Sequence, residues 1–330
     1  MNYTSEKKMV NDKVIVSVCC LSYNHHAYIR ECLEGFVLQK TDFAFEVLIY
    51  DDASTDETAN IIREYEKKHP DIIKPIYQTE NQYSKGVGVT RKYNFARAKG
   101  KYIAMCEGDD YWIDPLKLQK QVDFLEANEE YGVVHSDANV YFENTRKLVE
   151  NINKLNNRNL VNFDNPAEGI ILGSYSIYTL TSLFRISLLD NIDMKSPRKF
   201  EMGDLPLWLT FTKFTKFYYI DEPMAVYRKS EGSASNPLNK SAKLDFKISS
   251  KEVRLFFAKS LKLKTSTINE VSDQYNRAVL RKKFEIIEST KSSKVFFSIH
   301  KKTLKDVILL VGCKSKVLNS IVNKIIPEMS

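Results

Sequence analysis

A chain of 330 residues is long enough to bury a large core, and 43% hydrophobic with 28% charged residues is typical of a globular protein. No segment approaches the ~20 apolar residues of a membrane-spanning helix, and residues 1–13 lack the apolar core of a signal peptide. The five cysteines show no CxxC spacing, which argues against a disulfide framework and for a reducing compartment. We therefore expect a cytoplasmic protein whose membrane contact, if any, is peripheral.

The net charge of +7 is unevenly distributed along the chain. Residues 241–330 contain 19 Lys and Arg against 8 Asp and Glu, so they carry +11 and residues 1–240 carry −4. This division predicts two regions that meet different partners. We expect a first domain over 1–240 and a basic helical appendage over 241–330.

Strand-like and helical patterns alternate through the first region. Apolar β-branched runs predict buried strands, and apolar residues repeated every three or four positions predict helices between them. Short loops between the two kinds of element indicate an α/β fold, with a mostly parallel sheet and helices on both faces. The expected strands are 14–21, 45–50, 73–77, 102–106, 131–137 and 217–221, and the expected helices are 29–37, 58–68, 90–98 and 116–128. Segments 170–172 and 178–184 are expected to be strand-like or buried, and 144–165 is expected to be a mobile loop or an excursion over the site.

Three carboxylates follow the apolar run 102–106 directly: Glu107, Asp109 and Asp110, with Gly108 among them. Open α/β sheets bind ligands at the carboxyl ends of their strands. Crowded carboxylates repel one another unless a cation neutralises them, and Mg²⁺ or Mn²⁺ prefers such hard oxygen ligands together with substrate phosphates. The motif therefore predicts a divalent metal held for a diphosphate; the alternative is an acidic turn that caps the next helix.

A second acidic pair, Asp51 and Asp52, ends the strand over 45–50. In a parallel sheet this pair reaches the same edge as the first acidic motif, so we expect one crevice to contain both. There is no GxGxxG after the first strand and no GxxxxGK[ST] in the chain, which excludes the usual glycine cradles for phosphate.

Three further residues have two interpretations each. Asp204 precedes an apolar helical run, where it is either an N-cap or a carboxylate base. His135 is more simply a packed histidine than a ligand. Arg228, in a segment expected to be a basic, flexible return, either reaches a pyrophosphate or lies on a solvated face.

The last region is helical in period, over 242–263, 270–288 and 304–326. The segment 304–326 combines many Ile, Leu and Val residues with lysines, which is typical of a basic amphipathic helix. It either lies on a membrane surface or packs on the core or on another copy of the chain. No recognised nucleic-acid module is present.

Four segments in order, Ser22-Tyr23-Asn24, 49–56, 98–103 and 107–112, resemble the family 2 glycosyltransferases of the GT-A type, over roughly residues 13–235. The resemblance is to bacterial enzymes that build capsule, exopolysaccharide or lipopolysaccharide. It implies an inverting hexosyltransferase that uses a nucleotide-diphospho-sugar, typically a UDP-sugar, a divalent metal, and a glycan or lipid-linked acceptor. A non-catalytic scaffold that acts through its basic tail is the alternative.

The resemblance also implies roles for individual residues. Tyr23 would stack on the base, with Leu21 and Ser22 in the same turn; Asp51 and Asp52 would accept hydrogen bonds from the base. Further residues would serve as follows: Arg91 near the diphosphate, Glu107-Gly108-Asp109 as the DxD motif, Asp109 or Asp110 on the metal, and Asp204 as catalytic base.

The chain departs from the family pattern at two positions. The first acid of the DxD motif is Glu107, and Ser230 stands where many relatives carry a histidine that helps to cover the donor. Metal dependence and closure over the donor are the properties that these differences affect.

Overall fold

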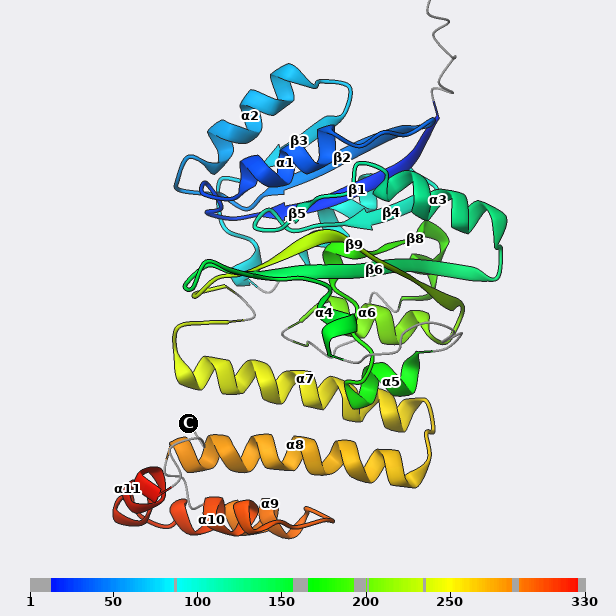
Figure 1. Ribbon diagram of the computed structural model, residues 1–330. Helices are drawn as coiled ribbons and strands as arrows, with labels where there is room; N and C mark the ends of the chain where they lie inside the picture. Colours follow the sequence, from blue (N-terminus) through cyan, green and yellow to red (C-terminus); the bar gives the residue numbers. More distant parts are fainter. Residues whose placement is uncertain are drawn as a thin grey trace, which may run out of the picture. The chain divides into compact units, whose positions relative to one another are not determined.

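The computed structural model describes residues 13–85, 88–156, 166–192, 200, 202–233, 236–286 and 291–325. The chain packs into two compact units, each formed from several segments (Figure 1). The first comprises Met1–Asn165, Ile177–Ile192 and Phe211–Lys229, and the second Pro166–Ser176, Asp193–Thr210 and Ser230–Ser330. The predicted boundary at residue 240 does not coincide with this division, because residues 166–176, 193–210 and 230–240 of the first region belong to the second unit.

The first unit is built on one mixed sheet, with the strand order β3-β2-β1-β4-β8-β6-β9-β5 and β7 paired with β6. The α/β GT-A fold class is confirmed: β1 pairs in parallel with β2 and β4, and β2 with β3. The remaining half is mixed, since β6 pairs with β9 in parallel but with β7 and β8 antiparallel. The strands are β1 (Val14–Ser22), β2 (Ala44–Asp51), β3 (Ile73–Tyr77), β4 (Tyr102–Met105), β5 (Tyr111–Trp112), β6 (Tyr131–Phe142), β7 (Lys147–Val149), β8 (Leu183–Arg185) and β9 (Lys216–Lys229).

The helices of this unit bury the apolar stripes that the sequence predicts. In α3 (Lys117–Ala127), Leu118, Val122 and Leu125 are all buried. The helix α1 (Ile29–Val37) buries Leu33 and Phe36 in the same way, and α2 (Thr58–Lys68) buries Ile62. A short helix, α4 (Ile152–Leu155), follows β7.

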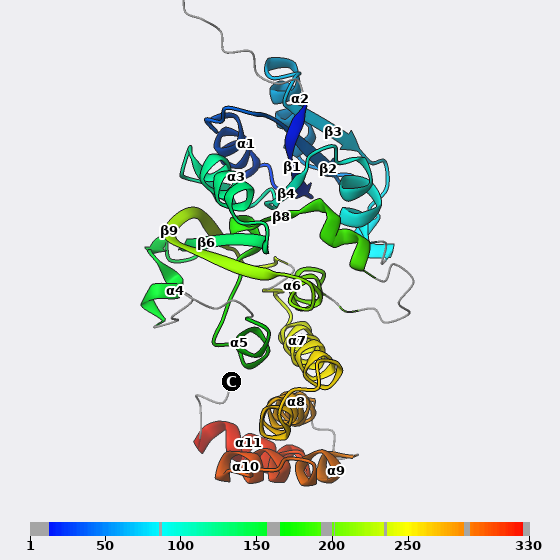
Figure 2. The same ribbon diagram turned by 90° about the vertical axis from the view of Figure 1, so that its right-hand side faces the viewer.

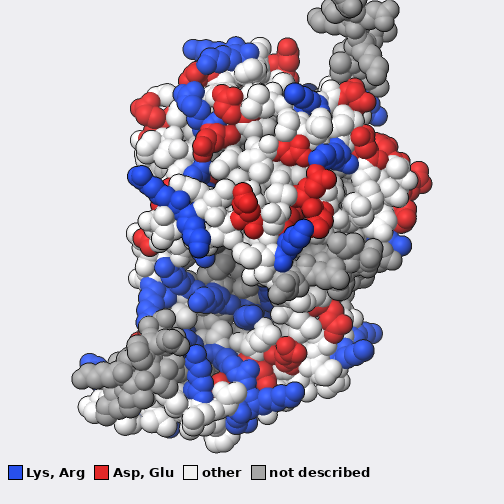
Figure 3. Space-filling model, viewed as in Figure 1, with Lys and Arg blue, Asp and Glu red and all other residues white. Residues whose placement is uncertain are grey.

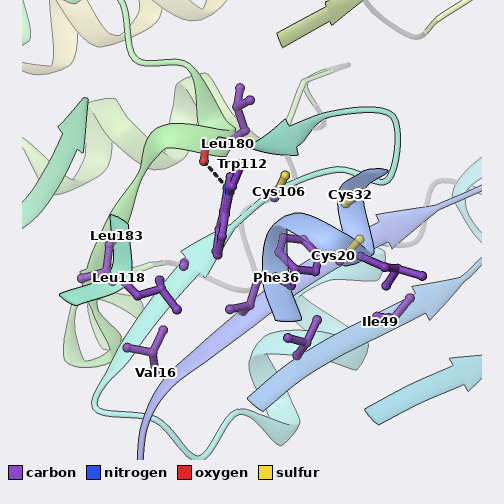
Figure 4. Close-up of a cluster of buried hydrophobic side chains, with 14 of the residues drawn as sticks. Val16, Cys20, Cys32, Phe36, Ile49, Cys106, Trp112, Leu118, Leu180 and Leu183 are labelled. Atoms are coloured by element: carbon purple, nitrogen blue, oxygen red, sulfur yellow. Dashed lines mark hydrogen bonds between the residues drawn. The ribbon is translucent and has the colours of Figure 1, made fainter. Parts of the chain in front are cut away.

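The core of the first unit lies between the sheet and these helices (Figure 4). The ring of Trp112 meets the ring of Phe36 edge to face, with 4.8 Å between centroids, and its Nε1 donates to the carbonyl of Leu180 at 2.8 Å. Val16 of β1 and Ile49 of β2 are fully buried in the same cluster. The packing of Trp112 therefore fixes the two-residue strand β5. A strand this short is not found by a search for apolar runs.

Four local predictions are wrong or incomplete. Residues 90–98 form a π-helical turn and a 3₁₀ turn rather than a regular helix. Ile170 and Ile171 are buried, which is one of the two predicted alternatives, but they lie in a helix, α5 (Ala167–Leu172), and not in a strand. The expected loop 144–165 contains β7 and α4, and its part 157–165 lies outside the described residues. The strand β9 continues through Lys229, so residues 227–229 are not a flexible return.

The second unit is helical. Its two long helices, α7 (Lys240–Ser260) and α8 (Thr265–Glu285), lie side by side in both views (Figures 1 and 2). The predicted helix over 304–326 is two helices, α10 (Leu304–Gly312) and α11 (Lys316–Ile325), preceded by α9 (Ser292–Phe297). Among the described residues, no helix combines the length and the hydrophobicity needed to cross a bilayer.

Lys117 is an unusual member of the first unit's core, because its side chain is fully buried. Its Nζ donates to Oε1 of Gln121 at 2.9 Å and lies 4.2 Å from the centre of the Trp112 ring. Burial lowers the pKa of the Lys117 ammonium from 10.5 to about 7, because the charged form loses its hydration.

We expect Lys117→Met to reveal this shift through the pH dependence of stability. Between pH 7 and about 9 the unfolded chain keeps a proton that folded Lys117 releases, so the free energy of unfolding rises with pH, by on the order of 1 kcal/mol per unit. Lys117→Met lacks this pH-dependent contribution. Its free energy of unfolding should exceed that of the parent at neutral pH, and the difference should shrink as pH rises. Urea unfolding at several pH values measures it, with exposed Lys67→Met as control. Parallel profiles for parent and Lys117→Met would contradict the burial argument.

Candidate functional site

The loops after β1, β2 and β4 meet at one edge of the sheet. The register pairs Ser22 with Asp51 and Cys19 with Met105, so the parallel strands end together. The Asp52 amide donates to the carbonyl of Ser22 at 2.9 Å, and the Gly108 amide donates to the carbonyl of Leu21 at 2.8 Å. The two acidic motifs are thus attached to consecutive residues of β1, as the sequence predicts.

Side-chain hydrogen bonds join the loops after β1 and β2. The Asn24 amide donates to Oγ of Ser54 at 2.9 Å, and Asn24 Oδ1 accepts from the Thr55 amide at 2.8 Å. Asn24 has φ of 54°, a left-handed conformation that asparagine tolerates better than most residues. The His26 ring lies 2.8 Å from Oδ2 of Asp56. These contacts hold the two loops together.

Asp51 and Asp52 are both buried, and each has a set of donors. Asp52 accepts the amides of Gln82 at 2.7 Å and Tyr83 at 2.9 Å, one on each carboxylate oxygen. Asp51 accepts the amide and hydroxyl of Ser54, and burial raises the pKa of Asp51 although these bonds lower it. A carboxylate oxygen has two acceptor sites, so Asp52 can hold the turn after β3 and still accept from a ligand.

The three acids of the loop after β4 have different surroundings. Glu107 is exposed, Asp109 is half-buried and Asp110 is only 4% exposed. Asp110 accepts the backbone amide of Arg228 at 2.7 Å. Burial and then the charge of Asp109 raise the pKa of Asp110 well above its usual value. Asp110 is therefore buried and hydrogen-bonded within the protein, whereas Glu107 and Asp109 lie nearer the surface.

Arg228 fixes this loop from strand β9. Its Nε donates to the carbonyl of Asp109 at 2.9 Å, and its two terminal nitrogens donate to Glu31 and Glu143. The side chain is 6% exposed, so its placement on a solvated face is wrong, and each guanidinium nitrogen is already bonded within the protein. Three rings lie 4.7–5.6 Å from the guanidinium carbon: Tyr28, Tyr111 and Tyr141.

Gly108 lies where a side chain would not fit. A Cβ at this position would come within 2.9 Å of Nδ1 of His25 and 3.0 Å of Oγ of Ser22. These two atoms and Oδ1 of Asp109 are buried, and none has a hydrogen-bond partner among the described residues. Buried polar atoms are nearly always paired, so three unpaired atoms around one glycine indicate a place for a polar ligand.

The remaining predicted ligand contacts lie beside these loops. Tyr23 is 44% exposed, which leaves its ring accessible for stacking. Arg91 lies in the π-helical turn Thr90–Asn94, which is anchored to β1 because Nδ2 of Asn94 donates to the carbonyl of Cys20 at 3.1 Å. Burial lowers the pKa of Arg91.

Asp204 and His135 are not among the residues of the loops after β1, β2 and β4. Asp204 is the first residue of α6 (Asp204–Phe211) and belongs to the second unit, so its role as a base stays a prediction. His135 is fully buried in β6, 5.2 Å from the ring of Tyr219, and burial lowers its pKa to about 3. It is a packed histidine, as expected.

The carboxylates at this edge of the sheet supply only part of the ligand shell of a hard cation. Within the described ranges, no three His, Cys, Asp or Glu side chains form a group that could hold a metal by themselves. Oδ1 of Asp109, buried and unpaired there, is a suitable single ligand. Because Mg²⁺ commonly takes one or two protein carboxylates and completes its shell with phosphate and water, this set suits a metal that arrives with a diphosphate.

Three residues of the site were not predicted from the sequence: His25, Glu31 and Glu143. His25 stands only two residues after Tyr23, in the loop that follows a buried strand, and this position was the available signal. The partners of Arg228, Glu31 and Glu143, are separated from it by 197 and 85 residues and follow no motif, so only the fold brings them together.

The chain is similar to known proteins in part of its sequence and in its fold. The model of the family "Glycosyl transferase family 2" matches residues 17–184. TuaG of Bacillus subtilis (strain 168), named as a teichuronic acid biosynthesis glycosyltransferase, is 30% identical over 254 residues, which cover 76% of this chain and 94% of TuaG. An uncharacterized protein of Mycobacterium tuberculosis is 46% identical over 132 residues, which cover 40% of this chain and only 37% of that protein.

Solved structures share the fold at low sequence identity. TarS 1-349 of S. aureus, in complex with UDP-GlcNAc, superposes with a TM-score of 0.57 at 20% identity, covering 91% of this chain and 79% of that chain. The mannosyltransferase PcManGT from Pyrobaculum calidifontis, in complex with GDP-Man and Mn²⁺, gives 0.53 at 15% identity, with 95% and 85% covered. These likenesses support the fold.

We expect Arg228→Met to destabilise the protein by about 3 kcal/mol, because it leaves the loop carbonyl and Glu143 without their buried donor. Glu31→Gln is the matched change at the exposed end of the same contact, where Glu31 is 60% exposed, and should cost less than about 1 kcal/mol. Urea unfolding of both variants measures the difference. Equal effects would show that Arg228 does not act through buried contacts.

Proposed function

The chain belongs to glycosyl transferase family 2, and from this premise we propose that it transfers a hexose from a nucleotide-diphospho-sugar to a hydroxyl of a glycan or lipid-linked acceptor. This transfer would be one step in the synthesis of a surface polysaccharide. The observation that carries the proposal is the attachment of both acidic loops to Leu21 and Ser22. In this proposal, that edge of the sheet binds the nucleobase, the diphosphate and the cation.

The nucleotide is a uridine nucleotide in this proposal, and it binds beside the loop after β1. Tyr23 stacks on the base, Asp52 accepts its N–H, and Arg91 approaches the diphosphate. The exposed ring of Tyr23 and the fixed carboxylate of Asp52 support this placement. The UDP-GlcNAc complex of TarS, a protein of the same fold, also favours a uridine nucleotide.

Asp109 is the carboxylate that would hold Mg²⁺ or Mn²⁺, and Glu107 is the nearest exposed acid. Asp110 keeps Oδ1 on the Arg228 amide, so it supports the loop and has only its second oxygen for a ligand. A divalent cation bound here would neutralise the charge that develops on the leaving diphosphate. The Mn²⁺ in the PcManGT complex supports a divalent metal.

Asp204 would be the base that removes the proton of the acceptor hydroxyl as that oxygen attacks the anomeric carbon. One displacement from the opposite face leaves no covalent intermediate and inverts the anomeric configuration. A carboxylate at the start of a helix is held in place by the helix itself, and Oδ1 of Asp204 accepts the Leu205 amide at 2.7 Å.

The test is a donor screen with UDP-, GDP- and dTDP-sugars, with and without Mn²⁺, on the parent chain and on Asp204→Asn. We expect sugar release only from UDP-sugars and only with the metal. Asp204→Asn should bind UDP as the parent does, while transfer falls by about 100-fold or more, because the base is lost but the donor site is not.

The matched control is Asp190→Asn, which removes an exposed carboxylate of the first unit and should leave both binding and transfer unchanged. Near-normal transfer by Asp204→Asn would exclude it as the base. UDP binding without turnover of any donor would favour the scaffold alternative over an enzyme.

A further inference from the structure

The described residues 291–325 of the second unit form a surface with one sign of charge. The stretch contains eight lysines, no arginine and one acid, Asp306. Asp306 is 1% exposed, and its carboxylate accepts from Nε of Arg277 at 3.1 Å, so it contributes no charge to the surface. The exposed lysines are Lys291, Lys294, Lys301, Lys302, Lys305, Lys314 and Lys316. Figure 3 shows one face of the protein, on which Lys and Arg gather over the helices of this unit.

The same stretch exposes apolar side chains in a regular pattern. Leu304 is 76% exposed, and Val307 and Val311 are each 41% exposed. Their spacing of three and four residues places them on one side of α10. Residues at other angles of the helix, Leu309 and Cys313, pack in the core of this unit, so the helix is already anchored without the exposed stripe.

Two more exposed apolar residues lie next to α10 in the chain. Phe297, at the end of α9, is 71% exposed, and Val317, at the start of α11, is 68% exposed. Lysines flank the stripe at both ends, with Lys301 and Lys302 before it and Lys314 after it. Single exposed apolar residues are ordinary, but a stripe of three on one helix, continued on both sides, indicates a contact surface.

We propose that this surface, α10 with its flanking lysines, docks on an anionic lipid bilayer. Basic amphipathic helices bind in the interfacial plane, with apolar side chains among the acyl chains and lysines at the headgroups. A second copy would bring the same positive surface against itself, which is repulsive. A nucleic acid would use the lysines but would leave Leu304, Val307 and Val311 without a partner.

The test is flotation of the full-length protein with vesicles of phosphatidylcholine alone, and with vesicles of equimolar phosphatidylcholine and phosphatidylglycerol. We expect binding to the anionic vesicles only, weakened by salt. The apolar variant Leu304→Ser with Val307→Ser and Val311→Ser should lower bound protein at least tenfold, because it removes the inserted side chains. All three positions are exposed, so the fold should be retained, which circular dichroism checks.

A charge variant and its matched control distinguish binding by this surface from attraction that depends only on the net charge of the protein. Replacing Lys301, Lys302 and Lys305 by Gln should weaken binding to anionic vesicles about tenfold or more. Replacing the exposed Lys259, Lys262 and Lys264 elsewhere in the unit by Gln should leave it nearly unchanged. Equal losses for the two variants, or equal binding to neutral vesicles, would overturn the proposal. A dimer in sedimentation that the apolar variant dissociates, without vesicle binding, would assign the surface to a second copy.

Discussion

The site depends on the last two carbonyls of strand β1. Leu21 accepts the amide of Gly108, and Ser22 accepts the amide of Asp52. Because these are consecutive residues of a buried central strand, the two acidic loops cannot move apart without breaking the strand's own end. The fold thus brings together carboxylates more than 50 positions apart in the chain, and side-chain contacts of Asn24 and His26 reinforce that edge.

Arg228 gives the three acids of the second loop different roles. Its backbone amide and Nε engage Asp110 and the carbonyl of Asp109, and its terminal nitrogens engage Glu31 and Glu143. Asp110 therefore serves to hold the loop, and Glu107 and Asp109 lie nearer the surface. The raised pKa of Asp110 favours its uncharged form, which limits the repulsion among the crowded carboxylates, although the amide and the charge of Arg228 lower that pKa in part.

Local patterns in the sequence predicted the parallel half of the sheet well, because buried strands such as Val14–Ser22 are continuous apolar runs. They failed where tertiary contacts decide the structure. The strand β5 has only two residues and is fixed by the packing of Trp112. The strand β9 continues through Arg228 because it pairs with β6 as far as Lys229, and carboxylates from two distant segments hold the guanidinium. The edge on which both acidic motifs lie was predictable from strand direction alone. The position of His25 in the loop after a buried strand was a signal too, but its closeness to Gly108 arises only in the folded loop.

The central claim is that the edge of the sheet around Gly108 binds the diphosphate and the metal. It is tested most directly by calorimetry of UDP binding in the presence of Mn²⁺, on Gly108→Ala and Gly88→Ala. A Cβ on Gly108 would contact His25 and Ser22, whereas one on Gly88 would meet no atom within 4 Å. We expect Gly108→Ala to weaken UDP binding at least tenfold and Gly88→Ala to leave it unchanged. Parental affinity in a folded Gly108→Ala protein would contradict the account.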